Sequence, residues 1–155
     1  MIALKKILVP TDFSSTSEVA LNYARAFAHE FGASLEVLHV LVDPMVYPAT
    51  MEWYPMPTTN YREEMEKGAR ERLESFMPSA EREELHAKLA VVWGSPFVEI
   101  IRYAKAENID LIVMGSLGLG PVGHMLMGSV AERVVRKAPC PVLTVRHPEH
   151  EFVMP

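Results

Sequence analysis

Short apolar runs alternate with longer amphipathic stretches along the chain. Residues 7–9 (ILV) and 34–41 (SLEVLHVL) have the apolar character of buried strands. Between them, apolar residues recur at helical spacing, at Ala20, Ala24, Phe27, Ala28 and Phe31. A strand, a helix and a second strand in this order predict a βαβ unit, with parallel strands and a right-handed crossover.

The same alternation continues to the end of the chain. It predicts a polar helix at 59–77, a strand near 86–93, a helix over 95–107, a strand at 109–114, a helix over 129–137 and a strand at 141–145. Strands this apolar are typical of a parallel sheet that is covered on both faces. The pattern therefore predicts a doubly wound α/β fold with five parallel strands and helices on both faces.

Polar residues mark where the helices are expected to begin and end. Ser15 with Glu18, and Ser129 with Glu132, have the spacing of capping boxes. Gly32 follows the first helix, where glycine commonly ends a helix. Ser129 therefore has two compatible interpretations, a helix N-cap and a phosphate ligand.

Residues 43–58 (DPMVYPATMEWYPMPT) form the one irregular region, with four prolines. Prolines at this density exclude a regular helix or a central strand. We expect a long loop that closes over a ligand, packs on a partner subunit or covers the protein's own surface.

Glycines gather after the fourth predicted strand. Five of the chain's eight glycines lie between Gly115 and Gly128, and Ser129 then opens a helix. Glycine lets backbone N–H groups approach a ligand closely, and a helix N-terminus favours phosphate. In open α/β sheets, ligands bind beyond the carboxyl ends of the strands, where the strand order reverses. The segment is therefore expected to cradle phosphate.

Two common phosphate motifs fit this segment poorly. No Lys-Ser or Lys-Thr follows a glycine, so the P-loop pattern is absent. Gly118, Gly120 and Gly123 match GxGxxG, but they follow the fourth strand, and the next strand has no acidic residue at its end to hold a ribose.

A third motif fits in full. Gly115, Gly118, Gly128 and Ser129 match the spacing G-x2-G-x9-G-[ST], the ATP-binding signature of the universal stress protein family. The resemblance covers nearly the whole chain, from KKILVPTDFS through LEVLHV to DLIVMGS and GSVAERVVRKAPCPVLTVR.

The resemblance implies the strand order 3-2-1-4-5, which brings the turn after the first strand next to the glycine-rich segment. It places Asp12 and the main chain of Val40 around adenine and ribose, and Mg²⁺ or Mn²⁺ on the phosphates. The residues expected at the nucleotide are Pro10, Thr11, Asp12, Val40, Met114, Gly115, Ser116, Gly118, Gly128, Ser129 and Val130.

One departure from the family's pattern bears on the ligand. Many members have Thr-His between the first two glycines and a basic residue after the second, where this chain has Ser116-Leu117 and Leu119. The loop has no nearby cation to neutralise phosphate, so we expect either weaker ATP binding or a shift of preference toward AMP or ADP.

Composition sets limits on the other partners. The chain has 155 residues, and we expect one domain over 1–147 with a tail over 148–155. A net charge of −5 argues against nucleic acid, and no apolar run approaches the length of a membrane span. The single cysteine, Cys140, suits a cytoplasmic protein.

Three functions follow from these patterns. The first is an ATP-dependent sensor or switch in the stress response. The second is a slow ATPase or nucleotidyl-transfer enzyme, which is less favoured because no Lys, Arg or acid lies between Gly115 and Ser129. The third is a nucleotide-free structural dimer. The resemblance and the exposed edge expected at Val142–Val145 both predict a homodimer paired through that strand.

Overall fold

The computed structural model describes residues 2–43, 60–117 and 127–147. Three longer segments lie outside these ranges. They are residues 44–59, which include all of the proline-rich region but Asp43, residues 118–126 of the glycine-rich region, and the tail over 148–155. Along the chain the elements are β1 (Lys6–Pro10), α1 (Ser15–Phe31), β2 (Ser34–Leu41), α2 (Tyr61–Phe76), α3 (Ser79–Glu84), β3 (Lys88–Trp93), α4 (Pro96–Ala106), β4 (Leu111–Gly115), α5 (Ser129–Lys137) and β5 (Val142–Val145).

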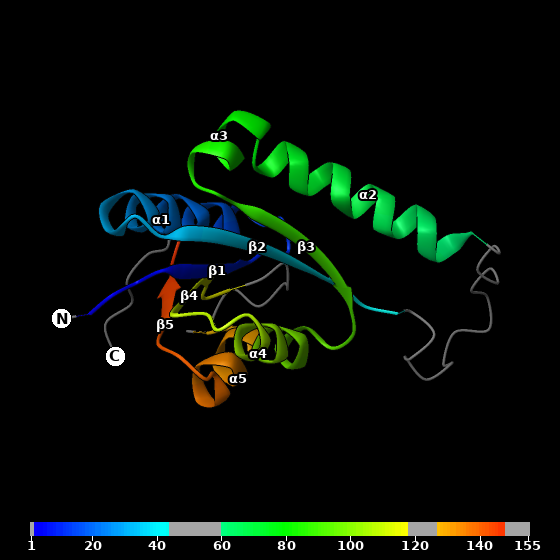
Figure 1. Cartoon of the computed structure of the whole chain (residues 1–155). Coiled ribbons are helices and arrows are strands. Elements are labelled where there is room, and N and C mark those ends of the chain that lie inside the picture. Colours follow the sequence, from blue (N-terminus) through cyan, green and yellow to red (C-terminus); the bar gives the residue numbers. More distant parts are fainter. Residues whose placement is uncertain (1, 44–59, 118–126, 148–155) are drawn as a thin grey trace.

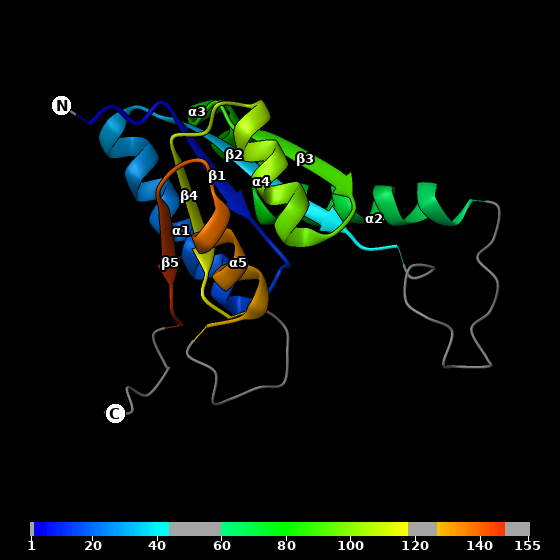
Figure 2. The same cartoon turned by 90° about the horizontal axis from the view of Figure 1, so that it is seen from below.

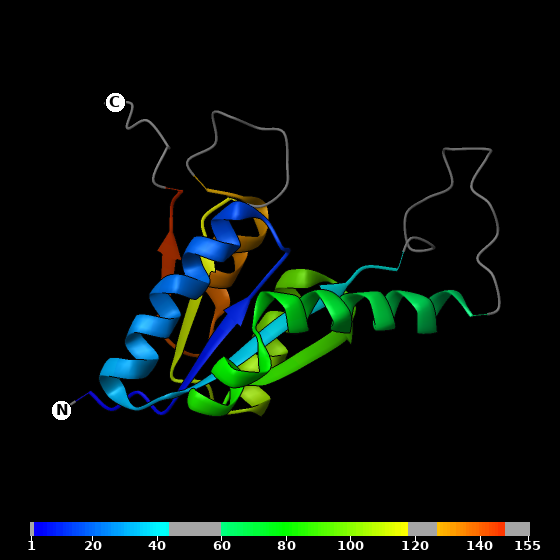
Figure 3. The same ribbon diagram turned by 90° about the horizontal axis from the view of Figure 1, so that it is seen from above.

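The five strands form one parallel sheet in the order β3-β2-β1-β4-β5, which confirms the expected fold (Figure 1). The helices α4 and α5 lie over one face (Figure 2), and α1 and α2 lie over the other (Figure 3). The strand order reverses between β1 and β4, so their carboxyl ends flank the switch point of the sheet.

Each face of the sheet has its own apolar core, because side chains alternate along each strand. In β1, Ile7 and Val9 pack toward α1 with Ala20, Leu21, Ala24 and other apolar residues. Leu8 packs toward α4 and α5 with Ile100 and Val134. All three β1 residues are fully buried. The central strands are therefore fixed from both sides and hold the switch point rigidly.

The strands β1 and β4 separate before they reach the switch point. They pair over Ile7–Leu8 and Leu111–Ile112, whereas β1 stays paired with β2 as far as Pro10 and Leu38. Since β4 continues to Gly115, the last residues of the two strands flank an opening rather than hydrogen-bond to each other.

Pro10 accounts for this early separation. The Thr11 N–H donates to the Leu38 carbonyl on the β2 side, and the Lys6 carbonyl accepts from Asp110 on the β4 side. Backbone groups of successive residues point to opposite sides of a strand, so position 10 faces β4. Proline has no N–H to donate there, and the ladder to β4 ends.

The first helix begins one residue earlier than its capping pattern predicts. Its N-cap is Ser14 rather than Ser15, and the Ser14 hydroxyl accepts from the Ser17 N–H at 3.2 Å. Its end is as predicted, because Gly32 has a φ of 63° and its N–H donates to the Ala28 carbonyl.

Ser129 is not an N-cap. It is the first residue of α5, Gly128 is the cap, and no side chain caps this helix. The Glu132 carboxylate pairs with Arg136 one turn on, at 2.9 Å, rather than reaching back to the cap. The capping interpretation of Ser129 is therefore wrong, and its hydroxyl is not used at the helix end.

The sequence pattern missed α3, a helix of six residues that has no buried side chain. An exposed helix of this length has no apolar face for a periodic pattern to reveal. The polar helix predicted at 59–77 is α2, which buries Ala69 and Leu73. Within the ranges that the structure describes, no helix is long and apolar enough to cross a membrane.

Candidate functional site

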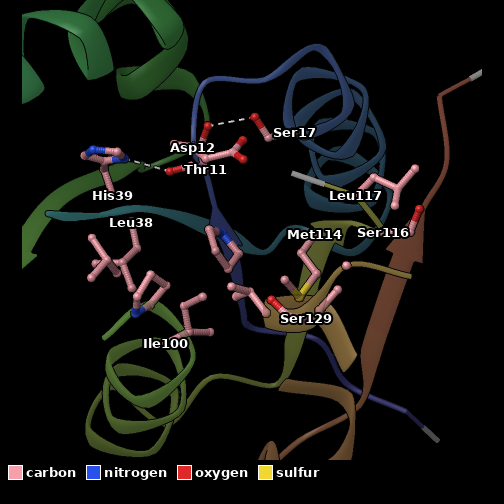
Figure 4. Close-up of a pocket in the computed structure, with 17 residues that line it drawn as sticks. Thr11, Asp12, Ser17, Leu38, His39, Ile100, Met114, Ser116, Leu117 and Ser129 are labelled. Atoms are coloured by element: carbon pink, nitrogen blue, oxygen red, sulfur yellow. Dashed lines mark hydrogen bonds between the residues drawn. The ribbon is translucent and has the colours of Figure 1, made fainter. Parts of the chain in front are cut away.

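A cavity of about 400 Å³ opens at the switch point, between the carboxyl ends of β1, β2 and β4 and the first turns of α4 and α5 (Figure 4). Its volume lies within the range of about 300–1,000 Å³ that is usual for small-molecule sites. Seventeen of the described residues line it.

Ten of the eleven residues expected at the nucleotide line this cavity. They are Pro10, Thr11, Asp12, Val40, Met114, Gly115, Ser116, Gly128, Ser129 and Val130. The eleventh, Gly118, lies outside the described residues. The structure thus brings together positions that are more than a hundred residues apart in the sequence.

The turn after β1 forms one wall and is held by its own side chains. The Thr11 hydroxyl lies 3.0 Å from the Ser17 hydroxyl, and Ser17 in turn donates to the Ser14 carbonyl. The Phe13 N–H donates to Thr11 Oγ1, and the Ser14 N–H donates to Asp12 Oδ1 at 3.0 Å. These bonds fix Asp12 at the rim of the cavity.

His39 joins this turn to β2. Its Nδ1 lies 2.8 Å from the Thr11 carbonyl oxygen (Figure 4). A carbonyl accepts only, so Nδ1 carries the proton and Nε2 has the free lone pair of the neutral ring. Burial lowers the pKa of His39, which keeps the ring neutral at pH 7. His39 is half-buried and forms part of the wall of the cavity.

Gly115 allows α1 to approach the end of β4. A Cβ placed on Gly115 would lie 2.8 Å from Thr16 Cγ2 and 3.2 Å from the Thr16 carbonyl carbon. These distances are too short for carbon atoms, so a side chain there would push α1 away from the sheet. Gly115 therefore has a packing role in addition to lining the cavity.

Ser116 and Gly128 close the base of the glycine-rich loop. The Gly128 N–H donates to the Ser116 carbonyl at 2.6 Å, and the Ser116 N–H donates to Val145 of β5. The Ser116 side chain is 2% exposed, and its hydroxyl has no hydrogen-bond partner among the described residues. A buried hydroxyl without a partner is costly, and here it stands in the wall of a cavity.

The first turn of α5 adds donors to the same wall. The N–H groups of Ser129, Val130 and Ala131 have no acceptor within the helix, because an α-helix leaves its first N–H groups unpaired. They also lie at the positive end of the helix dipole. They form a region of the cavity wall that suits an anion, and Ser116 lines the same cavity.

Most of the lining residues that sequence reasoning missed are apolar. Seven further residues line the cavity: Ser17, Leu38, His39, Pro96, Ile100, Leu117 and Ala131. Pro96 and Ile100 belong to the first turns of α4, which no motif marks as a ligand site. Only the topology could have indicated that α4 reaches the cavity, because α4 follows β3, and β3 ends at the same edge of the sheet as the other strands.

The cavity carries little charge. Among the described residues that line it, Asp12 and His39 are the only ones with ionisable side chains, and none is Lys or Arg. The described part of the chain holds no group of three or more side chains that suits a metal ion. Within the described residues, recognition of an anion here rests on N–H and hydroxyl groups.

Comparisons with known proteins agree with this geometry. The model of the universal stress protein family matches residues 3–146. Universal stress protein MJ0531 of Methanocaldococcus jannaschii is 36% identical over 149 residues, which cover 95% of this chain and 85% of the relative. The solved structure of MJ0577, a hypothetical protein from a structural genomics study, is similar with a TM-score of 0.77 and 31% identity, over 96% of this chain and 99% of the other.

Two further structures share the fold at lower identity. A universal stress protein solved in complex with cAMP matches with a TM-score of 0.63 and 22% identity, over 94% of this chain and 98% of the other. The universal stress protein of Archaeoglobus fulgidus in complex with dAMP matches with a TM-score of 0.62 and 20% identity, over 94% and 99%. The family model and the relatives above 30% identity agree over nearly the full length, and the chain belongs to the universal stress protein family.

Proposed function

We propose that the chain binds an adenine nucleotide, ATP first of all, in the cavity at the switch point, and acts as a nucleotide-dependent sensor or switch. The observation that carries the proposal is that hydrogen-bond donors without internal acceptors gather around Ser116. Ser116, whose buried hydroxyl has no partner among the described residues, and the first turn of α5, whose N–H groups have no acceptor within the helix, line one cavity. Phosphate oxygens would accept from both.

The rest of the nucleotide fits the other walls. Leu38, Val40, Pro96 and Ile100 form an apolar surface that suits a purine ring. In this proposal Asp12 receives the ribose hydroxyls, and the backbone of Val40 meets the base. Two universal stress proteins of the same fold have been solved with cAMP and with dAMP, which supports an adenine nucleotide as the ligand.

Any Mg²⁺ or Mn²⁺ would be held by the phosphates and by water, because the cavity offers one carboxylate, that of Asp12. The same sparse charge argues against efficient hydrolysis. Phosphoryl transfer needs a base aimed at water and cations for the developing charge, and the lining residues include no Lys or Arg. We therefore propose a binding protein, with slow ATP hydrolysis or nucleotidyl transfer as the alternative.

A homodimer through β5 is part of the proposal. β5 lies at the edge of the sheet and has four residues, Val142–Val145. Three of them are half-buried and Val145 is buried. A second copy pairing with this edge would satisfy its unpaired backbone groups. The experiment that checks this is sedimentation of the wild type beside Thr144→Pro, which removes an N–H from the open edge of β5 and is expected to sediment as a monomer.

The first experiment is to denature the purified protein and identify any released nucleotide by anion-exchange chromatography. ATP or ADP near one per chain supports the proposal, and incubation with Mg²⁺–ATP then measures turnover. If the protein is empty, calorimetric titration with Mg²⁺–ATP, ADP and AMP decides which nucleotide binds. Absence of binding in all three titrations contradicts the proposal and leaves the nucleotide-free dimer.

A further inference from the structure

Phe13 lies next to Asp12, but its ring is turned away from the nucleotide cavity. Its φ is 63°, in the left-handed region where a bulky side chain is an outlier. Phe13 does not line the nucleotide cavity; it lines a second one of about 730 Å³, between the sheet and α2. A strained backbone of this kind persists only where its surroundings hold it.

The ring of Phe13 is held from three directions. Its centroid lies 4.6 Å from that of His39 and 5.7 Å from that of Phe76, which it meets edge-on. The guanidinium carbon of Arg72 lies 4.1 Å from the same centroid, within reach of a cation–π interaction. Arg72 and Phe76 belong to α2 and do not line the nucleotide cavity.

We infer that this clamp, made of Phe13, His39, Arg72 and Phe76, positions the turn that presents Asp12 to the nucleotide. The ring contacts hold the left-handed conformation of Phe13. That conformation allows the N–H groups of Phe13 and Ser14 to reach the Thr11 hydroxyl and the Asp12 carboxylate. These residues are positioning residues, and α2 thereby acts on a site that it does not line.

The inference rests on the proposed function, since it concerns how the nucleotide site is preorganised. Releasing the clamp would let the turn sample other conformations, and the nucleotide would have to order it on binding. Affinity would fall although no group expected to contact the nucleotide had changed. The inference also has a consequence in the ligand-free protein, namely faster hydrogen exchange of the two turn amides.

The test uses Phe76→Ala, which removes one ring of the clamp. Phe76 does not line the nucleotide cavity and does not belong to the turn. In the ligand-free protein, the Phe13 and Ser14 amides should exchange about tenfold faster than in the wild type. The affinity for Mg²⁺–ATP should fall by roughly five- to tenfold. Leu85→Ala is the matched control, a core truncation near the amino end of the sheet, and should change neither quantity.

Variants of Phe13 itself separate ring packing from backbone conformation. Phe13→Gly removes the strain together with the ring, and Phe13→Ala removes the ring alone. If the clamp positions the turn, both lose affinity by about tenfold. Phe76→Ala should then add nothing in the background of Phe13→Ala, because both act through one ring. Arg72→Lys keeps the charge but loses the planar contact, and should lose affinity less than Phe76→Ala does.

Each outcome bears on a different claim. Unchanged exchange of the Phe13 and Ser14 amides in Phe76→Ala overturns the clamp. Faster exchange with unchanged ATP affinity, or a Phe13→Gly variant that binds like the wild type, overturns its positioning role. Faster exchange in a protein whose wild type binds no ATP contradicts the proposed function but leaves the clamp as the device that holds this turn.

Discussion

One buried polar side chain at the amino end of the sheet and one at its carboxyl end differ in whether they have a hydrogen-bond partner. Glu36 of β2 is 4% exposed, yet its carboxylate accepts from the Tyr103 hydroxyl at 2.6 Å and lies within 4 Å of Lys6 and Lys88. Ser116 is buried as deeply at the other end and its hydroxyl has no partner among the described residues.

This difference in pairing suggests that Glu36 stabilises the fold, whereas Ser116 belongs to the proposed ligand site. An unpaired buried polar group costs about 1–3 kcal/mol of stability, and burying a charged group without a partner costs more. The Glu36 cluster avoids that cost within the protein. At the switch point, no described residue pairs with the Ser116 hydroxyl, and the first N–H groups of α5 have no acceptor within their helix. Substitutions at the two ends should therefore affect different properties.

The largest effect is expected for Gly128→Val at the carboxyl end. Gly128 has a φ of −72° and a ψ of 156°, which valine adopts without strain. The added isopropyl group crowds the start of α5, so affinity for ATP should fall by more than about a hundredfold. The free energy of unfolding measured in urea should stay within about 0.5 kcal/mol of the wild type.

The matched control for Gly128→Val is Gly68→Ala in the middle of α2. A Cβ at Gly68 meets nothing within 4 Å. Alanine there should raise stability by up to ~1 kcal/mol through helix propensity and leave ATP affinity unchanged. Equal losses of affinity in the two variants would contradict the assignment of the phosphate end.

The converse substitution is Glu36→Gln at the amino end. Replacing the charged acceptor of the Tyr103 hydroxyl and the neighbour of two lysines should lower the free energy of unfolding by about 2 kcal/mol. Calorimetric titration should give the same ATP affinity as the wild type. A tenfold change in affinity would show that the two ends are energetically coupled and would break the comparison.

Ser116→Ala should move stability and binding in opposite directions. Removing a buried hydroxyl that lacks a partner should raise the free energy of unfolding by up to ~1 kcal/mol. Loss of one donor to phosphate should weaken ATP binding by about tenfold. Chemical unfolding and titration of the same preparation measure both. A loss of stability together with unchanged affinity would mean that the hydroxyl has an internal partner.

The smallest effect concerns pH at the amino end. Burial, followed by the hydrogen bond to Glu36, raises the pKa of Tyr103 well above its usual value near 10. A raised pKa contributes stability that is fully present below the unfolded-state value and is lost as pH rises above it. Unfolding at pH 8–11 should show a decline above about pH 10 that Tyr103→Phe flattens. Equal declines in the two proteins would remove Tyr103 from the amino-end cluster.

Local patterns in the sequence were sufficient to predict most of the fold. Apolar strands such as Ile7–Val9 and the alanine face of α1 specify a parallel sheet through burial alone. The exposed helix α3 has no such pattern and was missed. Phe31 lies on the predicted apolar face of α1 but is 46% exposed, at the last residue of the helix.

The glycine spacing predicted the polar part of the site, and topology supplied the rest. Ser116 and Ser129 lie in a segment whose glycine spacing suits phosphate, so the sequence marks them as candidates, and both line the cavity. Ile100 and His39 reach the cavity only because of the strand order, and no local pattern marks them. The sequence pattern predicts Ser129 as the N-cap of α5, but the N-cap is Gly128. Residue spacing alone does not distinguish between two adjacent positions at which a helix can begin.

The most direct test of the central claim is to titrate Mg²⁺–ATP into ¹⁵N-labelled protein and follow the backbone amide signals. We predict that the amides of Ser116, Ser129 and Val130 shift the most, while those of Glu36 and Tyr103 stay in place. Absence of shifts at saturating ATP, or shifts centred on the Glu36 cluster, would contradict the claim that the carboxyl end of the sheet holds the nucleotide.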